Sequence, residues 1–131
     1  MIGLDTNVLV RYLMQDDAKQ AAQATRLLES LTPEAPGFVP LVTVIELVWV
    51  LSSCFDLGRA EIVRALDSLL RTKELVVEGV EVVWKALGQF RRGSADFADC
   101  LIERSAAAAG CERTVTFERA ATKHGGMTHV S

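Results

Sequence analysis

The chain has 131 residues, half of them hydrophobic, with a mean hydropathy of +0.23 and a formal net charge of −3 at pH 7. This length fits one domain over 1–131 that buries roughly two-thirds of the surface of its unfolded chain. There is no apolar run of the about 18 residues that span a bilayer and no secretion-signal pattern, so we expect a cytoplasmic protein without a membrane partner.

Strand-like and helix-like segments alternate along the first half of the chain. The apolar run 2–4 predicts a strand, and 8–14 has helical spacing. Asp16 is expected to cap the next helix and Thr43 the one after it. The other elements expected here are a helix over 18–31, a loop over 32–37, a strand over 38–42 that Pro40 shortens, and helices over 44–54 and 59–71, the latter after Gly58.

The same alternation continues in the second half. Expected here are a strand over 75–78, helices over 81–91 and 97–109, a strand over 114–117, a short helix over 118–124 and a strand over 128–130. Asp96 is expected to open the second of these helices, and Gly110 to end it in the left-handed conformation. This alternation predicts a parallel sheet flanked by helices.

Four acidic residues, Asp5, Glu46, Asp99 and Glu118, follow a predicted strand or lie in the first turn of a predicted helix. The carboxyl ends of parallel strands form the crevice where open α/β folds bind ligands. Carboxylates gathered there repel each other unless a cation lies among them, and hard divalent cations prefer oxygen ligands. The pattern therefore predicts a metal site at one edge of the sheet.

Each acid also has a purely structural explanation. Thr43 and Glu46 have the spacing of a capping box, and Asp96 with Asp99 has that of an N-cap followed by a first-turn acid. Glu118 fits a first-turn acid, and Asp5 a turn with side-chain bonding to the backbone. These explanations do not account for all the acids falling at one edge of the predicted sheet.

The net charge hides an uneven distribution. A single site containing Asp5, Glu46, Asp96, Asp99 and Glu118 would leave the rest of the chain with a net charge of +2. A basic rim around an acidic centre would suit a nucleic-acid substrate, although the same residues also fit ordinary solvated helix faces. The basic residues concerned are Arg59, Arg64, Arg71, Lys73, Lys85, Arg91 and Arg92.

Other catalytic signatures are missing from the sequence. There is no glycine-rich phosphate loop and no nucleophile elbow, and His124 and His129 are expected to be surface or tail histidines. A haloacid-dehalogenase-type phosphatase needs a second Asp two positions after the first, where this chain has Asn7. Cys54, Cys100 and Cys111 lack metal-ligand spacing and are expected to be small buried side chains.

Four sequence blocks together resemble the PIN-domain ribonucleases, and among them the VapC-like toxins of toxin-antitoxin pairs. The blocks are Leu-Asp-Thr-Asn-Val, Val-Ile-Glu-Leu-Val-Trp-Val-Leu, Ala-Asp-Phe-Ala-Asp-Cys-Leu-Ile and Thr-Val-Thr-Phe-Glu-Arg-Ala-Ala. The resemblance covers essentially the whole chain. It implies a three-layer α/β/α fold with a central parallel sheet of about five short strands, and Mg²⁺- or Mn²⁺-dependent cleavage of RNA.

The resemblance also implies roles for individual residues. Asp5, Glu46 and Asp99 match the family's catalytic and metal-binding acids, and Asp96 matches an additional one. At the last acidic position the family usually has Asp, whereas this chain has Glu118, so a site with one metal ion is expected. Three residues match positions that orient the carboxylates or the waters of the metal: Thr6, Asn7 and Thr116.

The partners implied by the resemblance are an RNA substrate, with tRNA among the candidates, a cognate antitoxin and a second copy of the chain. Arg91 and Arg92 are candidates for binding RNA phosphates. The apolar residues expected to contact a protein partner, or else to pack in the core, are Trp49, Val48, Val50 and Leu51. A PIN-like binding module without catalysis is the alternative, and Glu118 is its only support.

Overall fold

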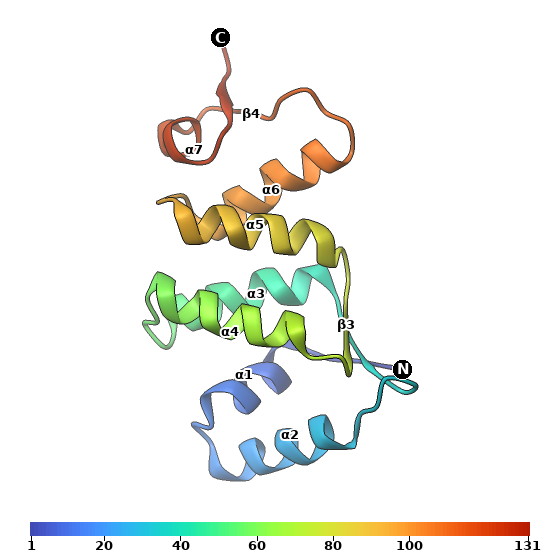
Figure 1. The fold of residues 1–131 in the computed structure, drawn as a ribbon. Helices are drawn as coiled ribbons and strands as arrows, with labels where there is room; N and C mark the ends of the chain where they lie inside the picture. Colours follow the sequence, from blue (N-terminus) through green and yellow to red (C-terminus); the bar gives the residue numbers. More distant parts are fainter. The chain divides into compact units, whose positions relative to one another are not determined.

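The computed structural model describes residues 1–131, and the chain forms two compact units, 1–78 and 79–131. Figure 1 shows the course of the chain through both of them. None of the helices is both long enough and apolar enough to cross a membrane. Because the placement of the two units relative to one another is not determined, each unit is described by itself.

The first unit is built on a parallel sheet of three short strands in the order β1-β2-β3. Within this unit, β1 and β2 are each followed by two helices. The elements of this unit are β1 (Ile2–Gly3), α1 (Thr6–Met14), α2 (Ala18–Ser30), β2 (Gly37–Val39), α3 (Leu41–Ser53), α4 (Arg59–Arg71) and β3 (Leu75–Val77). In Figure 1 α3 and α4 lie side by side, and α1 contacts both α2 and α3.

The register of this sheet sets the strand ends side by side. Ile2 pairs with Gly37, and Gly37 pairs with Leu75. The ladder extends past β1, because the Leu4 amide donates to the Phe38 carbonyl at 2.9 Å. Consequently β1 and β2 end next to each other, and the helices that follow them begin at the same edge of the sheet.

The second unit contains two packed helices and a separate pair of strands. Its elements are α5 (Val80–Arg92), α6 (Phe97–Ala108), β4 (Val115–Thr116), α7 (Arg119–His124) and β5 (Thr128–His129). The α5 and α6 helices pack together, and the Phe90 and Phe97 rings meet edge to face with centroids 5.7 Å apart. The strands β4 and β5 are parallel, and α7 contacts both of them.

The expected number of about five short parallel strands is confirmed. The expected single central sheet is not, because the strands form one sheet of three and a separate sheet of two. The strands β4 and β5 are two residues long, and the ladder pairs them only with each other. Other expectations are met closely: α4 spans Arg59–Arg71, and Gly110 has a φ of +94° after α6.

The N-cap expected for α2 was one residue off. Asp17, rather than Asp16, precedes the first helical residue, and its Oδ1 accepts the Gln20 amide at 2.9 Å. That amide belongs to the third helical residue, which is the usual partner of an N-cap side chain. Asp16 instead accepts from Arg11 Nη1 at 3.2 Å.

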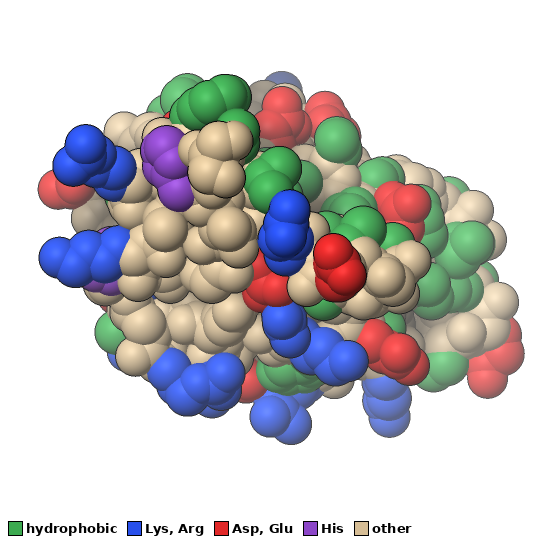
Figure 2. Space-filling view, turned by 90° about the horizontal axis from the view of Figure 1, so that it is seen from above, with side chains coloured by type: hydrophobic (Ala, Val, Ile, Leu, Met, Phe, Trp, Pro, Cys, Tyr) green, Lys and Arg blue, Asp and Glu red, His purple; other side chains and the backbone are tan.

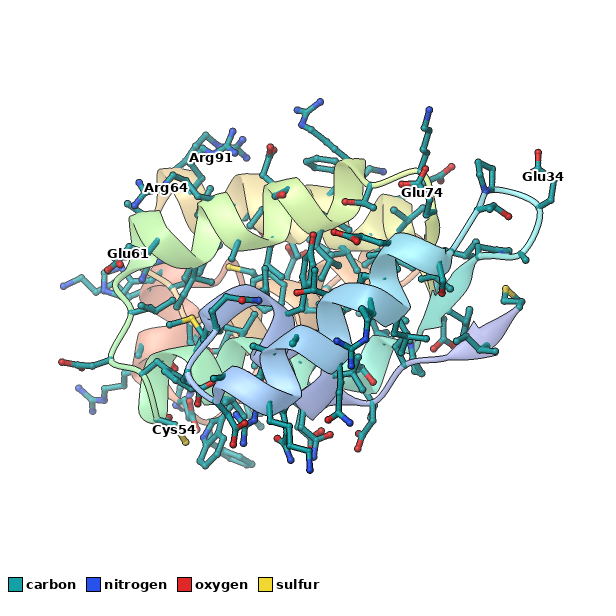
Figure 3. The ribbon with its side chains drawn as sticks, turned by 90° about the horizontal axis from the view of Figure 1, so that it is seen from below. Glu34, Cys54, Glu61, Arg64, Glu74 and Arg91 are labelled. Atoms are coloured by element: carbon teal, nitrogen blue, oxygen red, sulfur yellow. The ribbon has the colours of Figure 1, made fainter.

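The expectation of three buried cysteines holds only for Cys100. Cys54 and Cys111 are exposed, and all three are free thiols. The difference lies in their positions, since Cys54 follows the last residue of α3 (Figure 3) and Cys111 follows α6, whereas Cys100 lies within the first turns of α6.

Replacing Asp17 by Ala should lower the free energy of unfolding by about 1 kcal/mol, because the Gln20 amide loses its cap. Asp16→Ala is the matched control, and it should cost less because its ion pair with Arg11 is partly solvent-exposed. Urea denaturation measures both values. An equal or larger loss in Asp16→Ala would contradict the assignment of the cap.

Candidate active site

The acid after β1 lies where the α1 helix begins. Asp5 is the N-cap of α1, and its Oδ1 accepts the Thr6 amide at 2.8 Å. The parallel pairing of β1 with β2 places the start of α3 close to that of α1. As a result, the buried hydroxyl of Thr6 donates to Oε1 of Glu46 on α3.

The expected capping box of Thr43 and Glu46 is wrong. The α3 helix begins at Leu41 rather than Val44, and its first amide is bound by Glu78 Oε1 at 2.8 Å. The Thr43 hydroxyl donates instead to the Leu4 carbonyl at 3.4 Å. Because Glu78 supplies the cap from the end of β3, the carboxylate of Glu46 is not used to begin the helix.

Asp5 and Glu46 line one cavity of about 500 Å³ in the first unit. Sequence reasoning had selected four of its lining residues, namely Asp5, Thr6, Asn7 and Glu46. It missed Arg11, which follows Asn7 by one helical turn and so lies on the same face of α1, a signal that was available. The other lining residues are Val10, Asp16, Val50, Cys54 and Phe55.

In the second unit, two acidic side chains lie close enough to a third to change its pKa. The pKa of Asp99 is raised, first by burial and then by the nearby carboxylates of Asp96 and Glu118. Asp96 is at the N-cap position of α6 and Glu118 at that of α7, yet neither side chain makes a capping bond. The carboxylates of Asp96 and Glu118 are therefore close enough to act on Asp99, and neither is engaged in capping its helix.

Thr116 acts on the backbone rather than on a carboxylate. Its Oγ1 accepts the amide of Glu118 at 3.0 Å, which fixes the main chain where β4 ends and α7 begins. Glu118 itself is exposed. The hydroxyl of Thr116 thus helps set the position from which the Glu118 side chain extends.

The acids offer the oxygen donors that Mg²⁺ and Mn²⁺ prefer. Neither unit alone holds three His, Cys, Asp or Glu side chains in an arrangement that could bind a metal ion. The pKa of Asp99 is raised first by burial and then by the carboxylates of Asp96 and Glu118, and a cation would offset the charge of these carboxylates. The carboxylate oxygens and the negative charge of these residues therefore fit a hard divalent cation.

The remaining candidates are at the surface. Arg91 and Arg92 are exposed in the last turn of α5, and Figure 3 marks Arg91. His124 and His129 are exposed as expected, and histidine side chains are visible at the surface in Figure 2. His124 Nδ1 lies 2.9 Å from the Ser94 hydroxyl, and this pair is solvent-exposed.

These observations define the class of the protein. It is an α/β protein with parallel strands and with acidic residues at strand ends and helix starts. The family model for the PIN domain matches residues 2–126, spanning both units, and the chain belongs to this family. The chain is also similar to the "VapC ribonuclease" of Aquifex aeolicus (strain VF5), with 28% identity over 126 residues, covering 95% of this chain and 93% of that protein. The family match confirms the expected fold class.

Asp99→Asn should stabilise the metal-free protein at neutral pH. Because the folded state raises the pKa of Asp99, it binds this proton more tightly than the unfolded chain does. The free energy of unfolding therefore falls as pH rises from the ordinary pKa of Asp through the raised one, and the Asn variant lacks that fall. Thermal unfolding in EDTA at several pH values measures the effect.

Glu112→Gln is the matched control, since it removes an exposed acid of the same unit. It should leave the pH dependence of the Tm as in the wild type. If Asp99→Asn were no more stable than the wild type at neutral pH, the raised pKa of Asp99 in the folded state would be refuted.

Proposed function

We propose that this protein is a metal-dependent endoribonuclease that acts as the toxin of a toxin-antitoxin pair. The observation that carries the proposal is that Glu46, Asp96 and Glu118 all stand at or near helix starts without capping a helix. Capping therefore does not account for these three acids, although Asp5 does cap α1. Metal binding is the role that we propose for them. Membership of the PIN family and the similarity to a VapC ribonuclease support an RNA substrate.

Asp5, Glu46, Asp99 and Asp96 would bind one Mg²⁺ or Mn²⁺ ion, and Glu118 would contribute through its longer side chain. When bound, such an ion lowers the pKa of water and stabilises negative charge on phosphate oxygens. Asp99 must lose its proton to bind the metal, so its raised pKa predicts that metal affinity falls at acidic pH. Because these acids come from both halves of the chain, we also propose that residues 1–131 form a single domain.

The chain's own residues orient these carboxylates. Thr6, held in the first turn of α1, donates to Glu46 and fixes one of its oxygens. Asp5 is restrained by the amide of Thr6. Asn7 lines the same cavity, and Arg91 and Arg92 would contact phosphates of the RNA.

The α3 helix carries an apolar face that suits a protein partner. Trp49 is 62% exposed and Val42 71% exposed, with Ile45 between them at helical spacing. The neighbouring candidates Val48 and Leu51 are buried, so of the four residues expected there only Trp49 is largely exposed. An antitoxin and a second copy of this chain are the partners that we propose.

Asp5→Asn should abolish metal-dependent cleavage of RNA and leave the fold intact. Asn keeps the size and the capping oxygen of the side chain but removes the charge that binds metal. Gel analysis of RNA incubated with Mg²⁺ or Mn²⁺ measures cleavage, and circular dichroism checks the fold. Glu29→Gln, an exposed acid of α2, is the control and should remain active. Retained cleavage by a folded Asp5→Asn protein would refute the proposal.

Thr6→Val should weaken Mn²⁺ binding by about 10- to 100-fold, because Glu46 loses the hydroxyl that orients it. Isothermal titration of the wild-type protein should show about one Mn²⁺ ion per chain. Thr72→Val is a matched control, since its hydroxyl bonds the Ser68 carbonyl, away from the proposed metal ligands. No Mn²⁺ binding by the wild type would favour the alternative, a PIN-like binding module without catalysis.

A further inference from the structure

The cavity lined by Asp5 and Glu46 is also lined by residues that have no role in the proposed metal site. Two of them are the cationic side chain of Arg11 and the aromatic ring of Phe55. At about 500 Å³ the cavity is within the usual range for sites that hold one small ligand. The inference drawn from it rests on the proposed ribonuclease function and assigns the substrate contacts beside the acids.

Arg11 is the only Lys or Arg residue that lines this cavity. Three lining residues, Asp5, Asp16 and Glu46, are acidic, so a phosphate entering the cavity would be repelled unless cations offset them. A divalent ion on Asp5 and Glu46 would neutralise two of these charges. Without metal, Asp5→Asn removes one charge and the ion pair of Asp16 with Arg11 offsets another, so only Glu46 is left uncompensated. Arg11 is the one protein group placed to attract a phosphate next to that ion.

The guanidinium of Arg11 is held in place before any ligand arrives. Its Nε donates to Gln20 Oε1 at 2.7 Å, and its Nη1 donates to Asp16 Oδ2 at 3.2 Å. Neither bond uses Nη2, which carries two further N–H donors. A guanidinium fixed on one side loses little conformational entropy when its other side binds a phosphate oxygen.

The apolar part of the cavity suits a base. Phe55 is half-buried just after α3, and Val50 and Cys54 line the same cavity. Bases of single-stranded RNA stack on aromatic side chains, whereas paired bases in a duplex are already stacked and do not enter such a cavity. A phosphate contact and an aromatic face together match the two ends of one nucleotide.

We propose that Arg11 binds a backbone phosphate and Phe55 stacks on a base of one nucleotide of single-stranded RNA, next to the phosphate that is cut. Asp16 and Gln20 are then positioning residues for Arg11. A purely structural role is the competing explanation, in which Arg11 only ties α1 to α2 across the turn at Gln15, whose φ is +52°.

The test measures binding of a fluorescent single-stranded oligoribonucleotide by anisotropy, at several salt concentrations. The full chain carries Asp5→Asn, and EDTA is present, so the RNA stays intact and one repelling charge is removed. Into this background Arg11→Gln, Arg11→Lys and Phe55→Leu are introduced separately. Arg26→Gln is the matched control, because Arg26 is an exposed arginine of α2 that does not line this cavity.

Arg11→Gln should weaken binding about tenfold and lower the slope of log affinity against log salt by about 0.7, the value of one phosphate contact on a single strand. Arg11→Lys should keep most of that slope. Phe55→Leu should weaken binding at least about fivefold and leave the slope unchanged, as expected for the loss of one stacked base. A duplex of the same sequence should bind more weakly and respond to neither variant.

The proposal is overturned if Arg11→Gln behaves like Arg26→Gln in slope and affinity, if Phe55→Leu binds as the background protein does, or if the background protein does not bind the single strand. Cleavage by the wild-type protein with Mg²⁺ is assayed separately. Because binding is read without metal, a failure of the ribonuclease proposal and a failure of these contacts give different results.

Discussion

The parallel pairing of β1 with β2 determines where the first half of the candidate site lies. Both strands run in the same direction and end side by side, so α1 and α3 begin at the same edge of the sheet. That arrangement lets the Thr6 hydroxyl reach Glu46 and lets Thr43 bond the carbonyl of Leu4. A shift of the register by one residue would exchange the faces of β1 and separate these groups.

Charge is the second constraint on the molecule. Asp99, Asp96 and Glu118 repel each other in the second unit, and Asp5 and Glu46 share a cavity with Asp16 in the first. Such clusters are costly for folding and are kept where function requires them.

Much of the fold was predictable from local patterns. The α4 helix has a regular amphipathic pattern behind Gly58, and its bounds agree with the prediction. The errors arose where distant residues decide the outcome. Glu78 caps α3 from 37 residues away, so the local capping box of Thr43 and Glu46 did not form. The division of the strands into three and two likewise depends on pairing between distant segments.

The residues of the candidate site that could be predicted are those whose side-chain type alone indicates a function. The acids stood out because carboxylates at strand ends need an explanation, and Thr6 because it matches a position that the resemblance to PIN domains implies. Arg11 gave only a weak signal, its position one helical turn after Asn7, and the significance of Phe55 comes only from the cavity that both share with Asp5 and Glu46. Phe55 follows a helix end, where no periodic pattern indicates which way its ring lies.

The measurement that tests the central claim most directly is the fate of a total RNA pool incubated with the purified wild-type protein. We expect defined cleavage fragments in Mg²⁺ or Mn²⁺, none in excess EDTA, and recovery of cleavage when the metal is restored. RNA that stays intact in the presence of either metal, or cleavage that continues in EDTA, would contradict the account.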